Sequence, residues 1–90
     1  MRIEWNPQKA AGNIRKHGVS FLEAASVFYD PLSATAGDPD HSMVERRPIT
    51  FGMSAAGRIL VVSHVDREDT IRIITARPAT RKEGNLYEKG

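Results

Sequence analysis

The chain has 90 residues, of which 40% are hydrophobic and 27% charged, and it contains no cysteine. A chain of this size holds one small core, so we expect a single domain over residues 1–90. The composition excludes a mostly disordered chain, and the lack of cysteine excludes disulfides, thiolate zinc sites and a cysteine nucleophile. The longest aliphatic run, Ile59–Val62, is too short to cross a bilayer, and no apolar leader opens the chain. We therefore expect a cytoplasmic protein with no membrane partner.

The first residues predict a strand followed by a helix. Residues 1–5 alternate between apolar and polar side chains, which is typical of a short strand. Asn6 can cap a helix and the next residue, a proline, suits its first position, so a helix is predicted over Pro7–His17 and is ended by Gly18. Helical spacing then predicts two stripes along this helix. The stripe that faces inward is formed by Ala10, Ile14 and His17, and the adjacent polar stripe by Lys9, Asn13 and Lys16.

Two capping boxes mark further helices. Ser20 and Glu23 have the spacing in which each side chain accepts from the other's backbone N–H, which predicts a helix over 21–29. Thr80 and Glu83 repeat this pattern, so a last helix should begin at Arg81. Between them, a short edge strand is expected over 32–36 and three stronger strands follow. Alternation predicts a strand over 46–53, a run that is apolar on both faces predicts a central strand over 58–65, and β-branched residues predict a strand over 70–76.

This order of elements predicts an α+β domain of two layers. The expected topology is β-α-α-β(3–4)-α, with a mostly antiparallel sheet whose one face is covered by the helices. The other face stays partly open. If it carries basic side chains, it can bind a polyanion.

Charge is distributed unevenly along the chain. Residues 1–45 hold four basic and six acidic side chains, a net charge of −2, whereas residues 46–90 hold nine and five, a net charge of +4. The segment Thr70–Lys82 has no acidic residue. Such a local excess attracts phosphate, although a charged run also serves simply as a solvated surface. The cations of this segment are Arg72, Arg77, Arg81 and Lys82.

The residue types favour RNA cleavage over other chemistry. The three histidines lack the spacing of a metal site, and no phosphate-binding loop or nucleophile elbow occurs, so neither a metal nor a cofactor is expected. Attack by a neighbouring 2′-hydroxyl needs only an acid, a base and fixed cations around the phosphate. Arg72 and Arg77 on the last strand, Arg46 or Arg47 before an earlier one, and Arg81 are candidates. The alternative is a module that binds nucleic acid or protein without catalysis.

One geometric condition limits this interpretation. Arg72 and Arg77 are five residues apart, and a regular strand would send them to opposite faces of the sheet. They can serve one site only if the strand contains a bulge or bends at Pro78.

Motifs along nearly the whole chain resemble the BrnT family of bacterial toxins. The chain opens with Ile-Glu-Trp-Asn-Pro, and the segments 13–21 (Asn-Ile-Arg-Lys-His-Gly-Val-Ser-Phe) and 72–79 (Arg-Ile-Ile-Thr-Ala-Arg-Pro-Ala) follow in the family's order. Shorter matches of one or two residues lie between and after these segments, at Glu23-Ala24, Val27-Phe28, Asp30, Glu45-Arg46, Gly52, Glu83 and Tyr87.

The resemblance implies a RelE-like fold and the toxin of a type II toxin–antitoxin system. Such a toxin is a metal-independent endoribonuclease that inhibits translation. Its partners would be RNA, a BrnA-like antitoxin with a ribbon-helix-helix DNA-binding region and, only through that antitoxin, operator DNA. The matching positions imply that Lys16, Arg72 and Arg77 form the active surface, and His17, Glu45 and Arg46 also match the family pattern. We expect a catalytic set of Lys16, His17, Glu45, Arg72 and Arg77, and the cationic residues Arg46, Arg47, Arg81 and Lys82 are expected to bind RNA.

Several of these roles have two interpretations. His17 either acts as acid or base or caps its helix. Glu45 either accepts the 2′-hydroxyl proton or orients an arginine. Trp5 belongs to the core or stacks on a base, and Tyr87 docks the last helix or contacts the antitoxin.

Overall fold

The computed structural model describes residues 1–37 and 47–89 of the chain. Its elements follow the predicted order, so the α+β topology with four strands between the second and last helices is confirmed. In chain order they are β1 (Arg2–Trp5), α1 (Pro7–His17), α2 (Phe21–Ser26), a 3-10 helix η1 (Val27–Tyr29), β2 (Ala34–Ala36), β3 (Ile49–Met53), β4 (Ile59–Arg67), β5 (Thr70–Pro78) and α3 (Arg81–Lys89).

The five strands form one sheet in the order β1-β5-β4-β3-β2. Strands β2 to β5 form antiparallel pairs, whereas β1 lies parallel to β5. The predicted mostly antiparallel sheet is therefore confirmed. The pairing of β1 with β5 ends at Trp5 and Ile73, so the second half of β5 extends beyond its neighbour.

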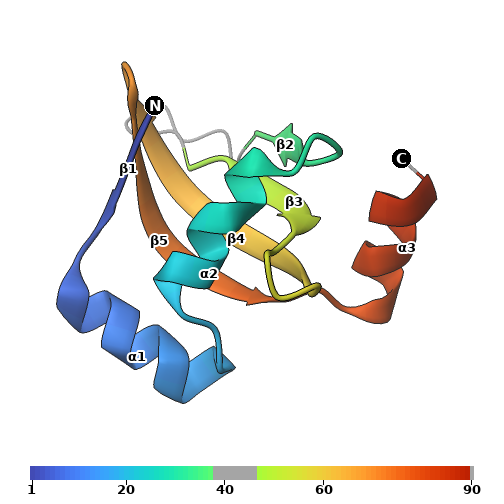
Figure 1. Cartoon of the computed structure of the whole chain (residues 1–90), viewed down its shortest axis with the longest axis horizontal. Coiled ribbons are helices and arrows are strands. Elements are labelled where there is room, and N and C mark those ends of the chain that lie inside the picture. The colour runs from blue at the N-terminus through green and yellow to red at the C-terminus, as the bar shows by residue number, and fades with distance from the viewer. Residues whose placement is uncertain (38–46, 90) are drawn as a thin grey trace.

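Helices α1 and α2 lie over one face of the sheet, as predicted, but α3 does not (Figure 1). It lies apart from the other two, past the end of the sheet where β3 ends. The chain reaches it through Ala79, whose N–H donates to the carbonyl of Ile59 (2.8 Å). Among the described residues, no helix is long and apolar enough to span a membrane.

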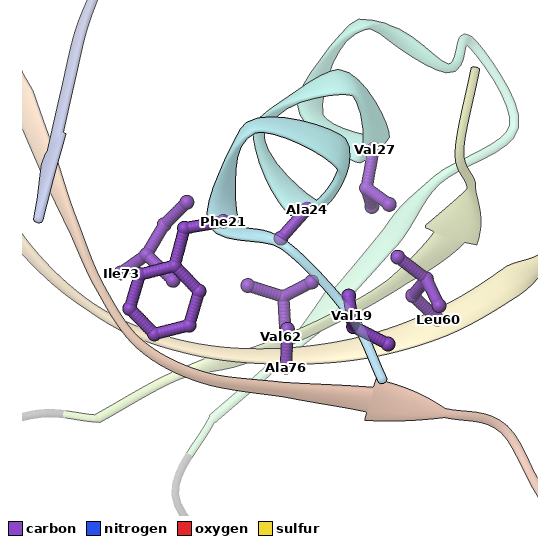
Figure 2. Close-up of a cluster of buried hydrophobic side chains, with 8 residues drawn as sticks. All are labelled: Val19, Phe21, Ala24, Val27, Leu60, Val62, Ile73 and Ala76. Carbon is purple, nitrogen blue, oxygen red and sulfur yellow. The ribbon is translucent and has the colours of Figure 1, made fainter. Parts of the chain in front are cut away.

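The core lies between the helices and the covered face of the sheet. In Figure 2, side chains from α2 and its flanks point toward side chains from β4 and β5. The ring of Trp5 packs edge-on against Phe21, with centroids 6.2 Å apart. Trp5 thus belongs to the core side of the sheet. The buried cluster consists of Val19, Phe21, Ala24, Val27, Leu60, Val62, Ile73 and Ala76.

Local signals set the helix ends. The Oδ1 of Asn6 accepts from the N–H groups of Gln8 (2.8 Å) and Lys9 (3.1 Å), which caps α1. Gly18 ends that helix in the left-handed conformation, at φ 69°. Both ends of α1 are where the sequence predicts them.

The first capping box is only half formed. Ser20 Oγ accepts from the N–H of Glu23 (3.0 Å), but the carboxylate of Glu23 binds Arg58 (2.5 and 3.0 Å) and Ser54 (2.7 Å) instead of returning to Ser20. The Arg58 guanidinium, as the main cause, lowers the pKa of Glu23. The carboxylate thus ties α2 to the turn between β3 and β4.

The predicted inward stripe of α1 is wrong at Ile14. This side chain is 50% exposed, whereas Asn13, predicted on the polar stripe, is only 6% exposed. Ala10 does pack against the core, and His17 is partly buried. The reason is that the amide of Asn13 finds backbone partners on β5, so a polar residue takes the central position of the buried face.

Gly52 allows β3 to approach η1 closely. A Cβ atom at this position would lie 2.7 Å from Val27 Cγ1 and 3.0 Å from Ser33 Cβ, and Val27 is fully buried. We therefore expect Gly52→Ala to lower the free energy of unfolding by about 1–3 kcal/mol. Gly12→Ala in α1 is the control, because its nearest neighbour at 3.9 Å is the flexible end of Arg15. Urea unfolding measures both, and equal stability of the two variants would contradict the close contact.

Candidate active site

A β-bulge in β5 brings Arg72 and Arg77 to the same face of the sheet. Ser63 pairs with Thr75 and His64 with Ile73, so Ile74 is an extra residue in β5. Ile73 and Ala76 both belong to the core beneath the helices, although they are three residues apart. Their neighbours Arg72 and Arg77 therefore point to the opposite, open face. The geometric condition set by the sequence is met.

A groove of about 840 Å³ lies around Arg72 on this open face. Among residues 1–37 and 47–89, four cations and two carboxylates line it, together with apolar side chains of β4 and β5. This arrangement suits an extended anion that also buries apolar surface, such as a nucleotide strand. The lining residues are Glu4, Lys9, Arg47, Val65, Arg67, Glu68, Thr70, Arg72 and Ile74.

Arg72 lies between two other residues that line the groove, Glu4 on β1 and Val65 on β4. Its partner across the strands is Glu4 on β1, whose Oε2 lies 3.9 Å from Arg72 Nη1. Both side chains are about half exposed, so this ion pair is weak and contributes well under about 1 kcal/mol. A phosphate entering the groove can replace or join Glu4 with little loss of stability.

The groove includes Lys9 and Glu4, which the sequence interpretation did not select. Lys9 lies in the first turn of α1, just past the end of β1, and reaches the groove beside Ile74. The signal was present in the polar stripe of Lys9, Asn13 and Lys16, which runs along the side of α1 that meets β5. Glu4 gives no such signal, because its position depends on the pairing of distant strands.

Arg77 lies at the far end of β5 and does not line the groove. At about 3.3 Å per residue, roughly 15 Å of strand separates it from Arg72. Its guanidinium forms two parallel hydrogen bonds to Glu83 of α3, at 2.8 and 2.9 Å. The Arg77 side chain is still 40% exposed. A phosphate can reach it only beside, or in place of, the carboxylate of Glu83.

Glu83 has two structural roles at the start of α3. Its carboxylate binds Arg77 and also accepts from the N–H of Thr80 (2.9 Å), while Thr80 Oγ1 accepts from the N–H of Glu83 (3.2 Å). The second predicted capping box is therefore confirmed. The same carboxylate links the cap of α3 to the end of β5.

The pKa of Glu83 provides a test of this contact. The Arg77 guanidinium, followed by the Thr80 N–H, lowers the pKa of Glu83 from its ordinary 4.5 to about 2. Because this pKa is lower in the folded protein than in the unfolded chain, the ionised carboxylate stabilises the fold at pH values above 4.5. This stabilisation is lost as the pH falls from 4.5 through about 2. An NMR titration of the Glu83 carboxyl should show a midpoint near 2, and Arg77→Ala should raise it toward 4.5. A midpoint near 4.5 in the original protein would contradict the contact.

Tyr87 docks α3 on the rest of the fold. Its hydroxyl donates to Asp30 (2.5 Å), and the same carboxylate accepts from the N–H of Met53 (2.8 Å). The hydrogen bond from the Met53 N–H is the main cause that lowers the pKa of Asp30, and the bond from Tyr87 is the second. The same bond to Asp30 raises the pKa of Tyr87. The structure thus gives Tyr87 the docking role.

The other predicted site residues are spread over the surface. Lys16 is exposed and His17 partly buried in the last turn of α1, and Arg81 and Lys82 are exposed in the first turn of α3. None of the four lines the groove, whereas Arg47 does. The positions of the two remaining residues, Glu45 and Arg46, lie outside the described residues.

His64, which the sequence suggested as a residue at the edge of the core in the central strand, is buried on the covered face. Its Nδ1 lies 2.5 Å from Asp66 and its Nε2 2.7 Å from Thr50, whose hydroxyl meets Thr35 at 2.8 Å. Phe28 covers the imidazole edge-on. This chain of hydrogen bonds joins β4 to β3 and β2. Within residues 1–37 and 47–89, no group of three histidine, aspartate or glutamate side chains is placed to hold a metal ion.

Comparison with known proteins agrees with this architecture. The model of the family described as "Ribonuclease toxin, BrnT, of type II toxin-antitoxin system" matches residues 5–83. The fold is similar to the crystal structure of the Brucella abortus ribonuclease toxin, BrnT, with a TM-score of 0.65 and 21% identity, covering 90% of this chain and 99% of that one. No curated protein matches the chain. Because the family match covers most of its length and includes both arginines of β5, the chain belongs to the BrnT family of type II toxin–antitoxin ribonuclease toxins.

Proposed function

We propose that this chain cleaves RNA on the open face of its sheet, without a metal ion, and thereby inhibits translation. The observation that carries the proposal is the bulge at Ile74, which puts Arg72 and Arg77 on one face beside a cationic groove. Two guanidinium groups this far apart on one face suit two non-adjacent phosphates of a single strand better than one small anion.

In the proposed reaction, the 2′-hydroxyl oxygen attacks the adjacent phosphorus as a base removes its proton. The bond from phosphorus to the 5′-oxygen breaks, an acid protonates that oxygen, and a 2′,3′-cyclic phosphate remains. Arg72 and Arg47 would neutralise the charge that the phosphate gains, and Arg77 would hold a second phosphate along the strand. Lys16, His17 and Glu45 are the acid–base groups expected from the sequence, but Lys16 and His17 lie outside the groove. Glu4 is the carboxylate that already lies in the groove beside Arg72.

The proposed biological setting follows from the family. The chain would be a single RelE-like domain over residues 1–90 that acts in the cytoplasm. A BrnA-like antitoxin with a ribbon-helix-helix DNA-binding region would neutralise it and connect it to operator DNA. Acidic and apolar side chains of that antitoxin would complement the basic groove and the apolar strands beside it. Antitoxin-bound protein should then cut RNA far more slowly than free protein.

Cleavage of a labelled RNA by purified protein in excess EDTA tests the proposal. We expect new 3′ ends carrying a cyclic phosphate, and no loss of rate with the chelator. Loss of cleavage on chelation would contradict the metal-independent mechanism. Salt-sensitive RNA binding without new termini would instead favour the alternative of a non-catalytic binding module.

A further inference from the structure

We infer that Asn13 is a positioning residue for Arg77, because its side-chain amide takes the place of the strand that β5 lacks beyond Ile73. The kinetic part of this inference rests on the proposed cleavage reaction. The structural part depends only on the contacts of α1 with β5 and is tested separately.

Asn13 binds the edge of β5 as a neighbouring strand would. Its Nδ2 donates to the carbonyl of Ala76 (2.8 Å), and its Oδ1 accepts from the N–H of the same residue (3.1 Å). A second bond from Nδ2 reaches the carbonyl of Val19 (2.9 Å), which follows α1. The amide thus satisfies both backbone groups of Ala76, because it presents a donor and an acceptor side by side as a peptide unit does.

These contacts explain why an asparagine lies inside a helix. Asparagine is an unfavourable residue at a helix interior, and burying its amide is costly without partners. An apolar residue of similar size would pack against the core but leave the N–H and carbonyl of Ala76 without a partner at the edge of the sheet. Asn13 therefore stabilises the edge of β5 more than it stabilises α1.

The position along β5 connects Asn13 to the candidate site. Pairing with β1 ends at Ile73, the bulge follows at Ile74, and the next residue held from this side is Ala76. A bulge disrupts the ladder locally and bends the strand, and beyond it β5 is held by β4 on one edge and by Asn13 on the other. Arg77 directly follows Ala76, and its direction toward the open face depends on that register.

The kinetic test is a double-mutant cycle between Asn13 and Arg77. Asn13→Asp keeps the size and the acceptor but loses both Nδ2 donors. Its kcat on a short labelled RNA should fall between about tenfold and a hundredfold, with KM within about threefold. In the Arg77→Ala background, the same change should alter kcat less than about twofold, since its effect passes through Arg77. Equal losses in both backgrounds would overturn the inference.

A matched control separates the geometry from the added charge. Asn6→Asp puts the same negative charge at the other end of α1 and keeps the cap, since Asn6 uses only its oxygen. It should leave kcat within about twofold. If Asn13→Asp does not fold, Asn13→Ser replaces it in the same cycle.

A titration of Glu83 needs no RNA, so it tests the positioning role of Asn13 independently of the proposed function. The Glu83 carboxyl, which titrates near 2 when Arg77 holds it, should titrate closer to 4.5 in Asn13→Asp and stay unchanged in Asn6→Asp. An unchanged Glu83 titration in folded Asn13→Asp would overturn the positioning role. If the original protein does not cut RNA but the titration moves as described, the proposed function fails and the positioning role of Asn13 stands.

Discussion

Arg72→Ala is expected to lower the rate of RNA cleavage by about a hundredfold to a thousandfold while the protein stays folded. Removing one fixed group that stabilises charge in a transition state typically has an effect of this size. Arg72 lines the groove, and its ion-pair partner Glu4 is half exposed, with its Oε2 3.9 Å from the guanidinium. The loss of stability should therefore be under about 1 kcal/mol. Single-turnover cleavage and thermal unfolding measure the two effects.

Arg15→Ala is the matched control for Arg72→Ala. It removes the same charge from an exposed position in α1 that does not line the groove. Its cleavage rate should stay within about threefold of the original protein, because an exposed charge outside a site acts only through the screened field of the whole surface. If Arg15→Ala lowers the cleavage rate as much as Arg72→Ala, the overall positive charge and not the groove determines the rate. If neither lowers it, Arg72 has no part in cleavage.

Phe21→Ala is expected to lower the free energy of unfolding by about 3–5 kcal/mol. The Phe21 ring is 1% exposed, packs edge-on against Trp5 and faces the core side chains of β5 (Figure 2). Domains of this kind are stable by only about 5–15 kcal/mol, so the loss removes a large share of the total. Urea unfolding measures it.

The neighbouring Leu22 provides the control for the core. It lies on the same helix but is 74% exposed, so Leu22→Ala should change stability by less than about 0.5 kcal/mol. The contrast between adjacent residues tests which face of α2 meets the sheet. A larger effect at Leu22 than at Phe21 would mean that α2 packs in another orientation.

Local signals explain what could be predicted from the sequence. The cap at Asn6, the glycine at position 18 and the capping box at Thr80 set the ends of α1 and the start of α3, because each acts within a few residues. Alternation, an apolar run and β-branched residues likewise identified the strands. These signals do not state which strands become neighbours, so the parallel pairing of β1 with β5 was not predicted.

The candidate site depends on contacts between distant segments. Spacing alone placed Arg72 and Arg77 on opposite faces, and only the pairing of β5 with β4 reveals the extra residue at Ile74. The helical periodicity that favoured Ile14 as an inward residue could not detect that Asn13 would meet the free edge of β5. Bulges and strand edges arise from the assembled sheet, so a single sequence carries little trace of them.

The resemblance to the BrnT family identified candidate site residues that periodicity could not identify. It selected Arg72 and Arg77 among the arginines, and both lie on the open face. It also selected Lys16 and His17, which lie outside the groove, so their roles stay predictions that depend on how RNA extends from Arg72 toward Arg77.

The most direct test of the central claim uses an RNA with a single 2′-deoxynucleotide at its main cleavage position. If the neighbouring 2′-hydroxyl is the nucleophile on the open face, the protein should still bind this RNA with unchanged affinity but should not cut it at that position. Undiminished cleavage there would show that water or another group attacks the phosphate, and would contradict the account.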